Sequence, residues 1–216
     1  MSLAAPVSRP VLADLIARPS DRARAFALDA ALVVAGAAVV ALLAQLTIPM
    51  WPVPMTAQTL GVLLVGASLG TVRGASSMVV YALAGLARLP VVAPSADGGH
   101  LTGAALLAGT TFGYIIGFVF AAGVVGFLAR RAWDRRVLQA IVAFAAGSVV
   151  IYAFGLPWLA MALSNLGIPQ DQLVAKTLAF GFVPFWIGDI VKAVFAGLLL
   201  PVAWRGVRAL EDRARD

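Results

Sequence analysis

Long apolar stretches separated by short polar breaks dominate the chain. About 20 apolar residues in a helix are needed to cross the hydrocarbon core of a membrane. Six stretches come near that length, at 26–48, 56–72, 75–89, 102–128, 137–163 and a sixth that ends near Trp204. The pattern predicts an all-α integral membrane protein, built as a single bundle of six transmembrane helices.

The start of the sixth helix is ambiguous. Residues 174–183 fit either the outer part of that helix or an interfacial stretch before a helix that begins at Pro184. Proline suits the first turn of a helix, and residues 184–204 are already long enough to span. We therefore expect the helix to begin at Pro184, with Asp189 and Lys192 inside the membrane but near one face.

Composition agrees with the apolar pattern and excludes several kinds of site. Hydrophobic residues make up 62% of the 216 residues and charged residues 12%, roughly half the charged fraction of a soluble domain. The absence of cysteine excludes disulfides and thiolate metal sites, and His100 alone cannot form a multi-histidine site. The first 25 residues lack the apolar core of a cleavable signal peptide.

The arginines predict the orientation in the membrane. Thirteen of them fall on one side of the predicted spans, at positions 9, 18, 22, 24, 73, 130, 131, 135, 136, 205, 208, 213 and 215. Positive charge is concentrated on the cytoplasmic side of membrane proteins. We expect residues 1–25 and 205–216 to be cytoplasmic segments flanking a transmembrane domain at 26–204. Since the arginines lie between apolar segments, they do not indicate nucleic-acid binding.

Asp189 and Lys192 are the chemical anomaly of the sequence. They lie three residues apart on one helix face, inside an apolar span where single charges are costly. One interpretation is an internal ion pair that fixes helix packing. The other is a ligand site that offers one strong acceptor and one strong donor, suited to a compact solute with N–H groups beside a carbonyl. A proton or cation pathway is a third interpretation, although a fixed lysine beside the aspartate repels cations.

Four stretches resemble one known family. They are GDIVKA at 188–193, PVPMTAQTLGVLLVGASLG at 52–70, YALAGLARLPVVA at 81–93 and GTTFGYIIGF at 109–118. Together they resemble the BioY family, the biotin-binding membrane subunits of energy-coupling-factor (ECF) vitamin transporters, over about residues 27–200. Where relatives tend to have proline–threonine–glycine–glycine–tyrosine, this chain has residues 110–114, TTFGY, which keep the hydroxyl of Thr111.

The resemblance implies a function and a ligand site. The chain would bind biotin with high affinity and take it up across the cytoplasmic membrane of a prokaryote. Asp189 would accept hydrogen bonds from the ureido nitrogens, and Lys192 would donate to the ureido carbonyl. Further site residues implied are Gln58, Thr111, Gly113 and Tyr114. Arg88 and His100 are candidate contacts for the biotin carboxylate because both are expected near the outer mouth of the pocket. The pocket should lie among the outward ends of the second, fourth and sixth helices, under loops 49–55 and 90–101.

The resemblance also implies partners: a transmembrane coupling subunit and two ATPase subunits. Ala31 and Ala35 belong to a row of small residues that would dock the coupling subunit, since small rows allow close helix approach. The chain has no nucleotide-binding loop, so we expect a transport protein without its own ATPase, cofactor or metal. Association between copies of the chain stays open. The alternatives are a binding subunit for another vitamin and a small oligomeric channel or exporter.

Overall fold

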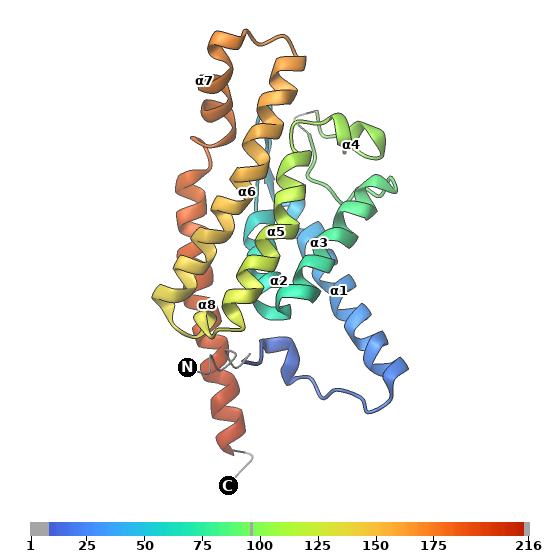
Figure 1. The fold of residues 1–216 in the computed structure, drawn as a ribbon, viewed down its shortest axis with the longest axis vertical. Helices are drawn as coiled ribbons and strands as arrows, with labels where there is room; N and C mark the ends of the chain where they lie inside the picture. The colour runs from blue at the N-terminus through green and yellow to red at the C-terminus, as the bar shows by residue number, and fades with distance from the viewer. Residues whose placement is uncertain (1–8, 96, 214–216) are drawn as a thin grey trace, which may run out of the picture.

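The computed structural model describes residues 9–95 and 97–213, and most of these are helical (Figure 1). Residues 1–8 and 214–216 of the predicted cytoplasmic segments lie outside the described residues. The helices are η1 (Leu12–Leu15), α1 (Arg22–Ala44), α2 (Gln58–Leu69), α3 (Thr71–Leu86), α4 (Ala104–Ala108), α5 (Phe112–Ala129), η2 (Trp133–Arg135), α6 (Val137–Asn165), α7 (Gln170–Gly181) and α8 (Trp186–Arg213). A two-stranded antiparallel ribbon, β1 (Thr47–Ile48) with β2 (Met55–Thr56), joins α1 to α2.

The helices form one elongated bundle. Helices α5 and α6 pack together at its centre, α1, α2 and α3 cover one side, and α8 lies on the other (Figure 1). The short α4 and α7 lie at one end, opposite the end that holds both the start of the described chain and the end of α8. This arrangement leaves the polar connections at the two ends and the apolar surfaces along the sides.

Four helical stretches of the described chain are long and apolar enough to cross a membrane: α1, α5, α6 and the stretch Gln170–Ala209 that holds α7 and α8. The predicted second and third spans are shorter, with 12 residues in α2 and 16 in α3. The all-helical membrane fold therefore agrees with the sequence prediction. The count of six spans and the orientation of the termini stay predictions.

Several helix boundaries differ from the predicted ones. The break between α2 and α3 lies at Gly70, whose φ of 84° suits glycine, so that Arg73 belongs to the first turn of α3. The predicted 102–128 helix is divided into α4 and α5, which a turn at Gly109 separates. Helix α8 continues past Trp204 to Arg213.

The start of the sixth span agrees with the preferred interpretation. Residues 174–183 fall largely in the separate helix α7, which ends at Gly181. Helix α8 then begins at Trp186, just after Pro184. Asp189 consequently occupies the first turn of α8, close to the end of the bundle where α7 lies.

Close backbone contact fixes α2 against α5. A methyl group added at Gly66 would lie 2.6 Å from the carbonyl oxygen of Ala122, closer than any real side chain approaches. Glycine at such a crossing lets two backbones touch, and in membranes this contact replaces the hydrophobic drive that lipid cannot supply. The position of α2, which carries Gln58 and Thr59, is therefore set by direct packing on α5.

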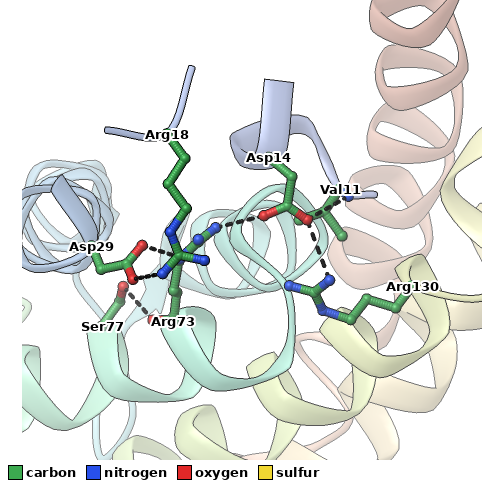
Figure 2. A network of polar contacts seen from close by, with 7 residues as sticks. All are labelled: Val11, Asp14, Arg18, Asp29, Arg73, Ser77 and Arg130. Carbon is green, nitrogen blue, oxygen red and sulfur yellow. Dashed lines mark hydrogen bonds and ion pairs between the residues drawn. The ribbon is translucent and has the colours of Figure 1, made fainter. Parts of the chain in front are cut away.

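A network of ion pairs holds the N-terminal segment against one end of the bundle (Figure 2). The two carboxylate oxygens of Asp14 bind different helices: Oδ1 lies 2.8 Å from Nη1 of Arg73 on α3, and Oδ2 lies 3.2 Å from Nη1 of Arg130 at the end of α5. Arg73 also pairs with Asp29 on α1 at 2.8 Å. Val11, next to this network, is fully buried. The segment thus links α1, α3 and α5 at one end of the molecule.

We expect Asp14→Asn to lower the free energy of unfolding by about 1–2 kcal/mol, because two partly buried arginines lose their shared charge partner. Thermal unfolding of the detergent-solubilised protein measures this. Asp97→Asn is the matched control: it removes the same charge from an exposed loop, and an asparagine oxygen can still accept from the N–H of Gly99. Equal unfolding midpoints for the two variants would contradict the prediction.

The contribution of Asp14 should depend on pH. Burial alone would raise the pKa of Asp14, but hydrogen bonds from the Val11 N–H and from Arg73, with the charge of Arg130, outweigh it and lower the pKa below its ordinary value. A carboxylate with a lowered folded-state pKa stabilises the protein above its ordinary pKa and loses that effect as the pH falls through the folded value. The wild type should therefore lose its advantage over Asp14→Asn in acid, below about pH 4.

Candidate functional site

A cavity of about 370 Å³ lies inside the bundle, towards the end that carries α4 and α7. Helices α2, α5, α6 and α8 form its walls, and segments 50–54 and 92–95 belong to the loops that border it. Most of the lining is apolar, with Ile115, Phe118, Ile151 and Phe185 among its members. The predicted second, fourth and sixth spans all contribute to the lining, and the predicted fifth span, α6, lines the cavity as well.

Asp189 and Lys192 both line this cavity and are held by neighbours from other helices. Nζ of Lys192 lies 3.3 Å from Oδ1 of Asp189, and the side chains are 19% and 13% exposed. The ammonium also donates to Oγ1 of Thr59 on α2, at 2.8 Å. The Tyr152 hydroxyl on α6 donates to Oδ2 of Asp189. The pair is thus part of a four-residue polar chain, Tyr152–Asp189–Lys192–Thr59, that joins α6, α8 and α2.

Gln58 lies at the start of α2, next to Thr59, and lines the same cavity. Its side chain is buried, and its Nε2 donates to the hydroxyl of Tyr81 on α3 at 2.5 Å. Its Oε1 accepts from Oγ1 of Thr56 at 3.1 Å. The amide is therefore oriented by two hydroxyls, one from β2 and one from α3.

Of the three site residues predicted near the start of α5, two line the cavity and one lies at a helix contact. Thr111 and Tyr114 line the cavity, whereas Gly113 does not. A methyl group added at Gly113 would lie 2.1 Å from Cβ of Trp158, so this glycine packs α5 against α6. The Tyr114 hydroxyl donates to the carbonyl of Gly181 at the end of α7, at 3.1 Å.

The two candidate carboxylate contacts lie outside the cavity lining. Nδ1 of His100 is 2.7 Å from the carbonyl oxygen of Val92, and the next residue, Leu101, does line the cavity. Arg88 has a positive φ of 68° just after α3 and packs its side chain near Gly103. Ser95 and Asn165 are polar residues that line the cavity itself.

Ala31 and Ala35 lie on α1, away from the cavity, and both are exposed. Ala27 continues the same row and is exposed as well. The row therefore faces outward from the bundle and is available to lipid or to another protein. Its predicted role at a partner interface stays a prediction.

Sequence reasoning missed Thr59 and Tyr152, which contact the charged pair, and Tyr81, which contacts Gln58. Each sits in an apolar stretch and carries a hydroxyl that needs a partner when it is buried. A hydroxyl in an apolar stretch thus indicates a hydrogen bond, but the sequence does not identify the residue that takes part in it. Within residues 9–95 and 97–213, no group of three histidine, cysteine, aspartate or glutamate side chains could hold a metal ion.

Comparisons with known proteins agree on one family. Residues 17–209 match the BioY family. The "Biotin transporter BioY" of Rhizobium etli is 36% identical over 87% of this chain and 95% of its own length. The "Biotin transporter BioY" of Thermotoga maritima is 34% identical over 72% of this chain and 83% of its own length. The fold is similar to the crystal structure of "the S-component for biotin from an ECF-type ABC transporter", with a TM-score of 0.66, 23% identity, and 87% and 95% of the two chains covered.

The close contact between Gly155 on α6 and the ring of Tyr114 can be tested by substitution. A methyl group added at Gly155 on α6 would lie 2.3 Å from Cδ1 of Tyr114. We expect Gly155→Ala to destabilise the protein by about 1–3 kcal/mol, more than the gain of about 1 kcal/mol in helix propensity. Thermal unfolding measures it. Gly206→Ala on α8, where the added methyl has no heavy atom within 4 Å, is the control and should unfold at or above the wild-type temperature. A Gly155→Ala protein as stable as that control would refute the constraint.

Proposed function

Because the chain belongs to the BioY family, we propose that it binds biotin in the cavity described above and serves as the substrate-capture subunit of an ECF-type transporter. The observation that carries the proposal is the Asp189–Lys192 pair, since both side chains line a cavity that is otherwise mainly apolar. The named relatives are transporters rather than enzymes, and the chain is a multi-pass membrane protein.

The chemistry of the cavity suits biotin. The ureido ring has two N–H groups beside one carbonyl, which fit an acceptor at Asp189 and a donor at Lys192. Hydrogen bonds to charged groups in a water-poor site are the strong kind, and such a site rejects ligands that leave its charges unpaired. The fused thioether ring would contact the apolar wall, with Phe118 and Ile151 among its residues. A volume of about 370 Å³ lies in the usual range for small-ligand sites.

Orientation and partners complete the proposal. We infer six spans with both termini in the cytoplasm of a prokaryotic cell, because the arginine-rich connections gather at the end opposite the cavity. Biotin would then enter from the outside, beneath loops 49–55 and 90–101. A transmembrane coupling subunit and two ATPase subunits would drive uptake, with the coupling subunit docking on Ala31 and Ala35. Arg88 and His100 stay our candidates for the carboxylate of the tail.

Asp189→Asn and Lys192→Ala should each weaken biotin binding by at least about 100-fold, because a buried donor or acceptor of the ligand loses its charged partner. Both variants should fold, since Lys192 keeps Thr59 and Asp189 keeps Tyr152 as a partner. Calorimetric titration of ligand-free, detergent-purified protein measures the affinity, with thiamine and riboflavin as comparison ligands.

Two outcomes of that titration would overturn the proposal. Wild-type protein that is folded but gives no heat with biotin would refute biotin binding, and tight binding of thiamine or riboflavin instead would assign another vitamin. Variants that fail to fold while the wild type binds nothing would favour a purely structural ion pair, as in a channel or exporter.

The partner surface has its own test. Ala31→Trp or Ala35→Trp should reduce ATP-dependent biotin uptake in cells with the complete transporter at least about tenfold, because a large ring prevents close helix approach. Biotin binding to the purified variant should be unchanged, since α1 does not line the cavity at these positions. Ala145→Trp, at an exposed alanine of α6, is the control and should transport normally. Equal uptake by all three variants would refute the assignment of this surface.

A further inference from the structure

We propose that Tyr152 on α6 is a positioning residue that orients the Asp189 carboxylate and thereby sets the selectivity of the cavity for a ligand with N–H donors. The inference rests on the proposed function and adds to it a residue outside the four stretches that carry the resemblance described above. The observations that carry it are the hydrogen bond of the Tyr152 hydroxyl to Oδ2 of Asp189 and the place of both residues in the cavity wall.

The two oxygens of Asp189 are held by different donors. Oδ2 accepts from Tyr152 on α6, and Oδ1 faces the Lys192 ammonium at 3.3 Å. The terminal torsion of an aspartate is broad, so a carboxylate held at one oxygen alone can turn. With both oxygens held, its plane is fixed. Each oxygen still has a free acceptor site, since an ionised carboxylate has about four in total.

The ring that carries the hydroxyl is itself fixed by other aromatic rings. Phe182 lies edge-on to Tyr152, with centroids 5.1 Å apart and planes at 76°. The Tyr114 ring also lies edge-on to Tyr152, with centroids 6.4 Å apart and planes at 83°. Phe182 directly follows α7, and the Tyr114 hydroxyl binds the carbonyl of Gly181. The same cluster therefore holds both the phenol and the segment from which α8 starts.

Because other rings hold the Tyr152 ring in place, the effect of its hydroxyl can be tested without disturbing the packing of the ring. Tyr152→Phe removes the donor to Asp189 and keeps the ring between Phe182 and Tyr114. The carboxylate is then free to turn towards Lys192. A carboxylate that turns can satisfy a ligand with fewer N–H groups nearly as well as one with two. We therefore expect the variant to discriminate less between ligands while its stability against unfolding changes little.

The experiment compares biotin with its two cyclic carbamate analogues, in each of which oxygen replaces one ureido N–H. Calorimetric titration of wild type gives the ratio of dissociation constants, analogue over biotin, for each carbamate. We expect Tyr152→Phe to weaken biotin binding by about tenfold and the more discriminated carbamate by much less, so that its ratio falls. Thermal unfolding of the ligand-free variant should stay close to wild type.

Thr47→Val is the comparison variant, because it removes a hydroxyl that donates to the backbone carbonyl of Ala44 and that does not line the cavity. It is expected to leave the carbamate-to-biotin ratio at its wild-type value, whatever happens to affinity. Equal biotin affinity in Tyr152→Phe and wild type, or a parallel loss for biotin and carbamates, overturns the positioning role while biotin binding stands. A folded wild type that binds no biotin overturns the proposed function itself.

Discussion

Two charges inside an apolar bundle impose the constraint on which the rest of the site depends. A lone carboxylate or ammonium at membrane depth is expensive, so each must be compensated locally. Here the compensation is a chain of four side chains, from Tyr152 through Asp189 and Lys192 to Thr59, which come from α6, α8 and α2. The chain fixes three helices relative to one another at the place where the cavity forms. The contacts that compensate the charges in the cavity wall are therefore the same contacts that place the helices.

A second polar network performs the corresponding task at the other end of the bundle. Asp14 joins α3 to the end of α5, and Arg73 extends the link to Asp29 on α1 (Figure 2). Between the two ends, contact depends on small residues, as where Gly66 meets the backbone of Ala122. Since lipid supplies no hydrophobic drive between helices, packing and polar ties must do this work. The bundle is thus fastened at its ends and closely packed in its middle.

The sequence predicted the helical bundle well because the apolar stretches are long and their breaks carry proline, glycine or arginine. It also predicted the cavity members Gln58, Thr111, Tyr114, Asp189 and Lys192, through the ionisable pair and the family resemblance. The sequence did not predict contacts between residues that are far apart in the chain. Thr59 and Lys192 are 133 residues apart, and no local pattern relates them. Gly113 carries a family signature, yet its observed contact is with Trp158.

Selectivity in such a site follows from the bonds that the protein already makes to itself. In this structure Lys192 donates to both Thr59 and Asp189, so an incoming carbonyl competes with partners that are already satisfied. A ligand gains free energy only by offering more than these internal bonds provide, which requires a donor and an acceptor at the correct spacing. A ligand with one of the two would leave a charge less well compensated than before it entered. The polar chain therefore holds the walls of the cavity together and also raises the requirement that a ligand must meet.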